Sequence, residues 1–295
     1  MLKDQAATLR TLASREATPR KRFRHSRVIV VASGKGGVGK TNIAVNLGLA
    51  WAEKGLQVAI LDADMGLANA DILLGINSPH NLSHVFSGER TVREIMTRGP
   101  FDLGLIAGGS GIAELADLSS TELARFIDSL KELDQTLDIL LIDTGAGISR
   151  SVMSFATASD ETIVVATPDP TSIADAYGLI KVLDARNPNT QLRIIVNLCD
   201  THGHGQEVFD RLNGVAQRFL NRELQLAGLI PRDVMVQRAV RQFQPFYLLY
   251  PHCRAAAAIG QIADTLLCEE SLGADAAQGF GGIGGFFQKI LQLVR

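Results

Sequence analysis

The chain has 295 residues, of which 46% are hydrophobic and 20% charged, and its formal net charge is -2 at pH 7. This length allows one large α/β domain or two smaller ones, and the near-neutral charge gives no global field to recruit nucleic acid or anionic lipid. Its 3 cysteines (Cys199, Cys253 and Cys268) are far apart and fit neither a disulfide framework nor a C-x-x-C metal or iron–sulfur site, which is typical of a reduced cytosolic protein.

No apolar run approaches the roughly 18 residues of a membrane span. The charged N-terminus also lacks the apolar core of a signal peptide. Residues 1–27 nevertheless differ in character from the rest of the chain. Residues 2–12 predict a short amphipathic helix that Pro19 breaks. Residues 20–27 are rich in arginine and contain no acid, so they form either a solvated tether or a contact for acidic protein, nucleic acid or lipid headgroups.

A phosphate-binding loop comes directly after the first predicted strand. The β-branched run at 28–31 predicts a buried parallel strand. It leads into a match to G-x-x-x-x-G-K-[ST], in which glycines let backbone N–H groups converge on phosphate oxygens. Lys40 can reach the β- and γ-phosphates, the Thr41 hydroxyl can ligate Mg²⁺, and the next helix adds positive charge behind the phosphates. We therefore expect the phosphates of a nucleotide and its Mg²⁺ to be bound by Gly34, Lys35, Gly36, Gly37, Val38, Gly39, Lys40, Thr41 and Asn42, and the resemblance described below implies that this nucleotide is ATP.

From Val28 the chain alternates apolar strands with helical segments, which predicts a doubly wound, mainly parallel α/β sheet covered on both faces. The predicted strands are 28–32, 58–62, 103–106, 139–143, 162–167, 192–197 and 225–230. The predicted helices are 42–54, 120–133, 149–158, 172–185, 206–221, 234–241 and 253–269. Ligands of such sheets bind at the carboxyl ends of the strands, so the residues that end each strand are the candidates for chemistry.

Carboxylates end two of these strands. Asp62 and Asp64 lie two residues apart on an extended segment and point the same way, so one could join the Mg²⁺ shell while the other orients an attacking water. Asp143 ends an apolar strand, the Walker-B arrangement on the Mg²⁺ side of a phosphate loop. Gly145 and Gly147 would let the next segment move when the γ-phosphate leaves.

The C-terminal residues are typical of a tethered helix. Residues 272–285 are rich in glycine and alanine, as in a flexible linker. The helix predicted after them is amphipathic and, at about 1.5 Å per residue, too short to span a bilayer. It is either a last core helix docked on the domain or an interfacial helix on anionic lipid, and the tether favours the second. Its apolar, membrane-contacting face would consist of Phe286, Phe287, Ile290, Leu291 and Val294.

Together these motifs resemble the MinD/ParA group of SIMIBI P-loop ATPases. In that group a lysine at the place of Lys35, within KGGVGKT, crosses an ATP-sandwiched homodimer to the partner's nucleotide. The match of 62–69 to DxDxGLxN implies that Asp64 positions water and that Asp62 is a Mg²⁺-shell or structural residue. The resemblance also implies that Lys35, Lys40 and Asp64 are catalytic, and that Thr41, Asp62 and Asp143 serve the metal. The adenine would contact Asn197, Pro231, Arg232 and Asp233, although the family most often has Tyr where Arg232 stands.

The N-terminal residues indicate which branch of this group the chain resembles. DQAATLR at 4–10 matches DQAxxLR, the mark of the flagellar-number regulators called FlhG, FleN or YlxH. This resemblance implies that the arm stimulates FlhF, an SRP-type GTPase, through Asp4, Gln5, Leu9 and Arg10. It also implies a cytoplasmic protein that is peripheral on the inner face of the membrane. Flagellar basal-body proteins and a flagellar transcription activator are partners in that family, although no residue here identifies them.

The predicted organisation is an N-terminal partner-activating arm (1–27), an ATPase domain (28–270) and a linker with its membrane-targeting helix (271–295). A MinD-type division-site regulator would share everything except DQAATLR. A ParA-type segregation ATPase would need a basic DNA-facing surface with steep salt dependence, and the net charge argues against direct nucleic-acid binding. A nucleotide-binding scaffold without hydrolysis is a further alternative, against which the Asp62 and Asp64 pair argues.

Overall fold

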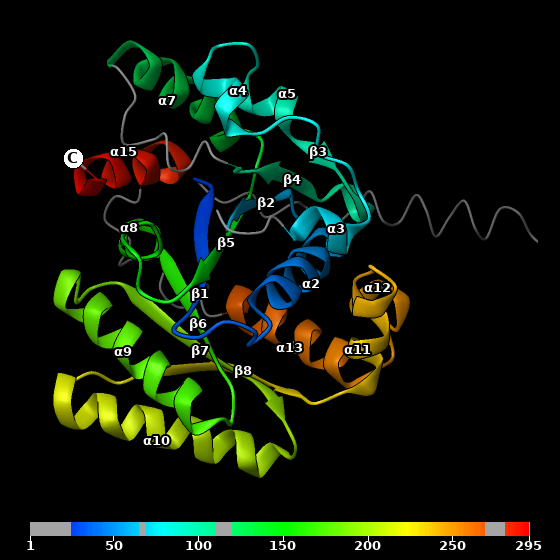
Figure 1. Ribbon diagram of the computed structural model, residues 1–295, viewed down its shortest axis with the longest axis vertical. Coiled ribbons are helices and arrows are strands. Elements are labelled where there is room, and N and C mark those ends of the chain that lie inside the picture. The colour runs from blue at the N-terminus through cyan, green and yellow to red at the C-terminus, as the bar shows by residue number, and fades with distance from the viewer. Residues whose placement is uncertain (1–24, 65–68, 110–119, 269–280, 295) are drawn as a thin grey trace, which may run out of the picture.

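The computed structural model describes residues 25–64, 69–109, 120–268 and 281–294. An eight-stranded sheet runs through the middle of the molecule in the order β3-β4-β2-β5-β1-β6-β7-β8 (Figure 1). All pairs are parallel except β3 with β4. The strands are β1 (Arg27–Ser33), β2 (Val58–Ala63), β3 (Thr97–Arg98), β4 (Gly104–Ala107), β5 (Ile139–Ala146), β6 (Glu161–Ala166), β7 (Gln191–Cys199) and β8 (Gln225–Pro231).

Helices cover both faces of this sheet, as the alternating pattern predicts. One face is covered by α4 (Leu82–Phe86), α5 (Val92–Ile95), α7 (Ser120–Asp134), α8 (Arg150–Ala158), α9 (Pro170–Arg186), α10 (His202–Leu220) and α15 (Gly282–Val294). The other is covered by α2 (Lys40–Glu53), α3 (Ala70–Leu74), α11 (Val234–Arg241), α12 (Phe246–Leu249) and α13 (Arg254–Cys268).

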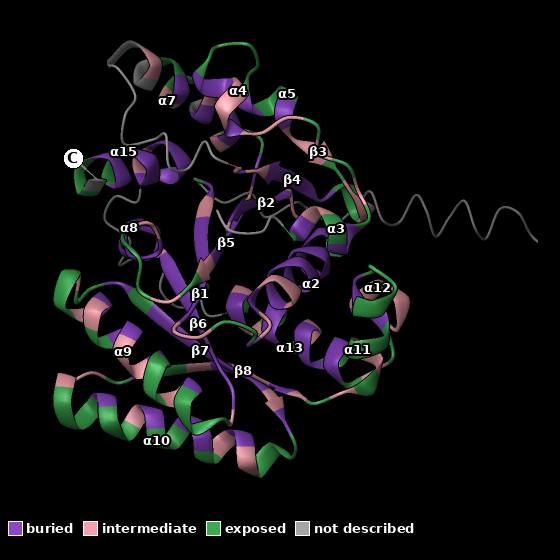
Figure 2. Ribbon diagram, viewed as in Figure 1, coloured by how far each residue is buried: buried purple, intermediate pink, exposed green. Residues whose placement is uncertain are grey.

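The central strand β1 shows how one apolar run supplies both cores. Val28 and Val30 belong to the core under α15, whereas Ile29 and Val31 belong to the core under α2 and α13. Successive side chains of a strand point to opposite faces, so a strand covered on both sides must be apolar throughout. Figure 2 shows the strands buried beneath helices whose outer faces are exposed.

All seven predicted strands are confirmed, with ends that differ by a few residues. Each predicted helix between residues 28 and 270 is also present. The sequence pattern did not indicate β3, α3, α4, α5, α12 or the 3₁₀ turn η1 (Pro100–Asp102). These elements have two to five residues, too few to show a period of 3.6 or 2.

A buried ion-pair network closes the amino ends of three strands. Glu161 of β6 has no solvent exposure, and its carboxylate pairs with Arg27 of β1 and with Arg193 of β7, the latter at 3.0 Å. Arg27 also donates to the Leu266 carbonyl of α13 at 2.9 Å. The network therefore joins the sheet to the last helix before the glycine-rich segment.

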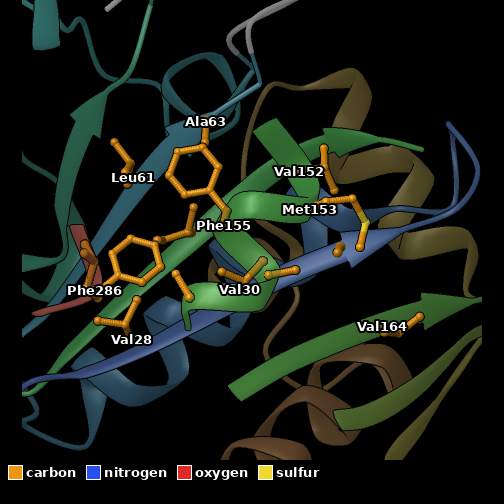
Figure 3. Packing of buried hydrophobic residues seen from close by; sticks show 14 of the residues in the cluster. Val28, Val30, Leu61, Ala63, Val152, Met153, Phe155, Val164 and Phe286 are labelled. Atoms are coloured by element: carbon orange, nitrogen blue, oxygen red, sulfur yellow. The ribbon is translucent and has the colours of Figure 1, made fainter. Parts of the chain in front are cut away.

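The C-terminal helix α15 is docked on the protein core. Ile283, Phe286, Phe287, Ile290 and Leu291 are each at most 7% exposed. Figure 3 shows Phe286 beside Phe155 of α8 and Val28 of β1, and the rings of Phe286 and Phe155 stack with centroids 6.0 Å apart. Among the described residues no helix is long and apolar enough to cross a membrane.

In this structure α15 adopts the docked one of its two expected arrangements. The sequence pattern favoured a face turned to lipid, but in this structure the face is turned to the protein, as in the docked alternative. The physical reason is a row of ring contacts: Phe287 meets the edge of Phe126, and Phe126 meets the edge of Phe86, at 5.1 and 4.9 Å. The side chain of Val294 lies outside the described residues.

A carboxylate anchors the start of the docked helix. Asp134, the last residue of α7, accepts the backbone N–H of Ile283 at 2.6 Å and that of Gly284 at 3.1 Å. These two N–H groups belong to the first turn of α15, where backbone N–H groups have no acceptor within the helix itself. Gly282 has φ +60° and passes so close to the Asp134 carboxylate that a side chain there would collide with it. Asp134 therefore joins α15 to the domain through a tertiary helix cap.

Candidate nucleotide site

The phosphate loop has the backbone conformation that its glycines predict. Gly37 and Gly39 have φ of 77° and 95°, and Gly39 ends the loop as the residue before α2. Gly34 packs against the backbone of Asp175 in α9 so closely that a side chain would collide with it. The loop thus opens towards the amino end of α2, where unpaired N–H groups favour an anion.

The side chain of Asn197 braces this loop from β7. Its Nδ2 donates to the Val38 carbonyl at 2.8 Å, and its Oδ1 accepts the backbone N–H of Leu198 at 2.9 Å. A Cβ on Gly39 would lie 2.6 Å from the same Nδ2, so the glycine is needed for this approach. Among the described residues Nδ2 donates only to Val38, which leaves one amide N–H for a base. The adenine contact expected from the resemblance stays a prediction.

The strand ends bring Lys40, Thr41 and Asp143 together. Asp143 lies opposite Val31 in β1 and opposite Asp62 in β2. Both of its carboxylate oxygens are buried without a hydrogen-bond partner among the described residues. Burial raises the pKa of Asp143 to about 7, and the neighbouring Thr41 hydroxyl and Lys40 ammonium oppose this shift. Burial also lowers the pKa of Lys40, against the pull of the Asp143 and Asp64 carboxylates.

This donor set fits Mg²⁺. A buried carboxylate whose two oxygens have no hydrogen-bond partner among the described residues is uncommon and is suited to bind a cation. Mg²⁺ prefers oxygen ligands and is usually held by one or two carboxylates or hydroxyls together with substrate phosphates. Thr41 and Asp143 would hold it on the β1–β5 side of the loop.

Asp62 has a different environment from Asp143. Its Oδ1 accepts the N–H of Asp64, and its Oδ2 accepts those of Asn69 and Ala70, all at 3.1 Å. Burial raises the pKa of Asp62, while these three backbone N–H groups act to lower it. Both oxygens are therefore engaged by backbone N–H groups, one just after β2 and two at the start of α3. This supports the structural alternative for Asp62, and a place in the Mg²⁺ shell stays a prediction.

Asp64 reaches back across the strand ends. A Cβ on Gly145, at the end of β5, would lie 3.4 Å from its Oδ1. Burial lowers the pKa of Lys40, and Asp64 is near enough for its charge to oppose that shift. Its carboxylate thus lies between the phosphate loop and the segment after β5, where a water attacking the γ-phosphate would need an acceptor.

A pocket of about 150 Å³ continues from the loop between β7, β8 and α11. Asn42, Asn197, Pro231, Arg232 and Asp233 line it, so the predicted base-binding residues do converge. The Arg232 guanidinium pairs with Asp200 at 2.9 Å, and Asp233 caps α11 through the N–H of Met235. The Oδ1 of Asn42 is buried without a partner among the described residues, so it is available to a bound nucleotide.

Lys35 is a predicted loop residue that points away from the cradle. Its Nζ donates to Asp169 and Thr171 at the start of α9, a contact that the sequence did not indicate. The sequence feature that could have indicated this contact is the carboxylate of Asp169 just after β6, because ligands bind at that edge of the sheet. The predicted partner-activating residues Asp4, Gln5, Leu9 and Arg10 lie outside the described residues.

Comparison with known proteins decides the family. A ParA family model, described as "NUBPL iron-transfer P-loop NTPase", matches residues 24–267. The chain is 40% identical to the antiactivator FleN of Pseudomonas aeruginosa over 80% of this chain and 84% of FleN. It is 35% identical to the flagellum site-determining protein YlxH of Helicobacter pylori over 91% of this chain and 90% of YlxH. The chain belongs to the FleN/YlxH branch of the MinD/ParA family.

Solved structures of MinD proteins share the fold. A chain of the MinC:MinD complex of Aquifex aeolicus has a TM-score of 0.66 at 24% identity, covering 82% of this chain and 96% of that one. MinD of Pyrococcus horikoshii, solved with Mg-ADP, has a TM-score of 0.64 at 22% identity, covering 86% and 100%. As a FleN/YlxH-type P-loop ATPase in which Thr41 and Asp143 fit the metal, the chain is an ATP hydrolase that uses Mg²⁺.

Proposed function

We propose that this ATPase regulates flagellar number or placement by acting on the GTPase FlhF, and that it dimerises with ATP. The observation that carries this proposal is the similarity to both FleN and YlxH over at least four fifths of the chain. The DQAATLR segment, which matches the arm of these regulators, supports FlhF as the partner. MinD-type relatives share the ATPase domain, so the arm is the feature that separates the two functions.

The chemistry proposed at the site follows from its own side chains. Lys40 and the N–H groups of the loop bind and neutralise the phosphates, and Asn197 keeps the loop in place. Asp64 accepts a hydrogen bond from the attacking water and aligns it with the γ-phosphate. Bound Mg²⁺ would supply further neutralisation of the phosphate charge. Hydrolysis then returns the dimer to monomers, so the nucleotide acts as a timer.

Membrane association is proposed to use α15 in an undocked state. The five buried apolar side chains of α15 cannot meet the core and a lipid surface at the same time. A single amphipathic helix binds a membrane weakly and reversibly, whereas a dimer presents two copies and gains by effective concentration. ATP-dependent dimerisation would thereby control residence on the inner face of the cell membrane.

The deciding experiment measures GTP hydrolysis by purified FlhF with and without a peptide of residues 1–25. The control peptide carries Asp4→Ala and Gln5→Ala. We expect stimulation by the first peptide and its loss with the second. No stimulation by the peptide or by the full-length protein would overturn the FlhF assignment, leave the ATPase chemistry in place, and favour a division-site or segregation role.

A further inference from the structure

A second hollow, of about 390 Å³, lies on the α2–α13 side of the molecule. It is enclosed by the end of α2, the turn η1, the residues around α12 and the middle of α13. Figure 1 shows α2, α12 and α13 together on this side, and η1, α12 and α13 all contact α2. The lining includes Glu53, Phe101, Leu248, Pro251, Ala257 and Gly260. These residues do not line the nucleotide pocket, so the hollow is a separate site.

Small residues of α13 keep this hollow open. Ala257 and Gly260 lie one turn apart on α13, and a Cβ added to Gly260 would meet no neighbouring atom within 4 Å. Phe101 forms another wall, is 47% exposed, and has a left-handed backbone (φ 55°) that L side chains rarely adopt. Apolar side chains from a further segment would fill the open space and remove the Phe101 ring from water.

The N-terminal arm leaves the domain close to this hollow. Residues 1–24 lie outside the described residues, and the Arg27 guanidinium, just after them, donates to the Leu266 carbonyl of α13 at 2.9 Å. Leu266 is six residues from Gly260, which is about 9 Å along a helix. Residues 13–24 span up to about 40 Å when extended. They are therefore long enough to bring residues 2–12 to the hollow.

The composition of the arm complements the hollow. The helix that its pattern predicts carries on one side Leu2, Ala6, Leu9 and Ala13. Residues 20–24 are basic and contain no acid. At the hollow, the carboxylate of Glu53 accepts a hydrogen bond from the hydroxyl of Tyr247 at 2.7 Å. This partner is neutral, so the charge of Glu53 can also attract the basic residues of the arm.

We propose that residues 2–12 dock in this hollow as an amphipathic helix, with Leu9 against Phe101 and Gly260, so that the chain holds its own arm. A tethered segment has an effective concentration of about millimolar, so a weak contact is enough for docking. Docking keeps the apolar face of the arm from any other protein. The consequence for FlhF rests on the proposed function: the full-length protein should stimulate FlhF less than the free peptide of residues 1–25 does.

Two substitutions act on the two sides of this contact. Gly260→Leu places a side chain in the open space that the arm would occupy, and leucine is also a better helix former than glycine. The matched control is Gly214→Leu in α10, because a Cβ there also meets no neighbouring atom within 4 Å. Leu9→Ala removes most of a buried side chain from the arm and should weaken docking about 10- to 100-fold.

The measurement is amide hydrogen exchange of the full-length protein, followed by mass spectrometry and read on residues 2–12. In the wild type these amides should exchange about tenfold or more slowly than in the free peptide, because a docked helix exchanges only when it undocks. Gly260→Leu and Leu9→Ala should exchange at the rates of the free peptides of matching sequence. Gly214→Leu should match the wild type, and thermal unfolding checks that each variant is folded.

Three results would overturn the inference. The first is exchange in the wild type that is as fast as in the free peptide. The second is slow exchange that persists in Gly260→Leu, which would place the arm elsewhere. The third is slow exchange that is lost on dilution, which would mean that the hollow takes the arm of a second copy.

The exchange experiment does not involve FlhF, so the two proposals fail separately. Slow exchange in the wild type, without stimulation of FlhF by the peptide or the protein, would refute the proposed function and leave the docking in place. Fast exchange, with stimulation by the peptide, would refute the docking and leave the proposed function in place.

Discussion

Removing the carboxylate that caps α15 should release this helix and raise membrane binding. Asp134→Ala deletes the acceptor of two backbone N–H groups in the first turn of α15, at 2.6 and 3.1 Å. The backbone carbonyl of Asp134, which accepts from the Ser26 hydroxyl, is kept. The substitution therefore weakens the docked state of α15 and leaves its apolar face unchanged.

The magnitude follows from the cost of a lost helix cap. Replacing an N-cap by alanine costs about 0.5–2 kcal/mol, and about 1.4 kcal/mol is a factor of ten in an equilibrium constant. We expect the undocked fraction of Asp134→Ala to rise about 2- to 30-fold. Gly282→Ala should act in the same direction, because its φ of +60° and the nearby carboxylate leave no space for a methyl group.

The assay is co-sedimentation of the full-length protein with vesicles of phosphatidylethanolamine and phosphatidylglycerol, without nucleotide. Asp134→Ala should bind about 2- to 30-fold more tightly, and the gain should vanish when residues 281–295 are also deleted. Thr201→Ala removes a cap from α10 instead and should bind like the wild type. If Asp134→Ala lowers the free energy of unfolding without any gain in vesicle binding, α15 is an integral core helix and the membrane proposal is wrong.

Three further predictions concern the site and the network beneath it. Asp64→Ala should lower ATP hydrolysis by about 100-fold or more while nucleotide affinity stays the same, as measured by phosphate release and nucleotide titration. Asp143→Asn should abolish the Mg²⁺ dependence of nucleotide binding. The raised pKa of Asp143 means that the metal-free wild type loses stability as the pH rises from about 4 to about 7. Asp143→Asn removes this titrating group, so thermal unfolding of the variant in EDTA should depend less on pH. Glu161→Ala leaves the guanidinium groups of Arg27 and Arg193 without their buried counter-charge and should cost about 3–5 kcal/mol in chemical denaturation.

The sheet and the phosphate loop could be predicted from the sequence because their causes are local. A strand covered on both faces is a continuous apolar run, and the loop conformation depends on glycines at fixed positions such as Gly37 and Gly39. The meeting of Asp62 with Asp143 followed from topology, since neighbouring parallel strands end at one edge of the sheet.

The contacts that refine the site could not be predicted because they join distant residues. Asn197 braces Val38 across 159 residues, and Asp169 holds Lys35 across 134. No local period or motif spacing encodes such pairs. Each partner also has an adequate local explanation, since Asp169 is an ordinary helix cap as well. The sequence therefore predicts which groups reach this edge of the sheet, whereas the packing of α9 and β7 decides which of them touch.

The C-terminal helix shows why one pattern supports two structures. An amphipathic face is defined by apolar side chains at helical spacing, and both a protein core and a lipid surface satisfy it. The structure adds two features specific to docking, the Asp134 cap and the ring contact between Phe287 and Phe126. If α15 binds a membrane as proposed, the core and the lipid compete for one face, and the apparent membrane affinity is the affinity of the free helix multiplied by the fraction of helix that is free. A substitution that weakens the Asp134 cap or the ring contacts therefore raises the free fraction of α15. The expected membrane affinity rises by the same factor, until most of the helix is free.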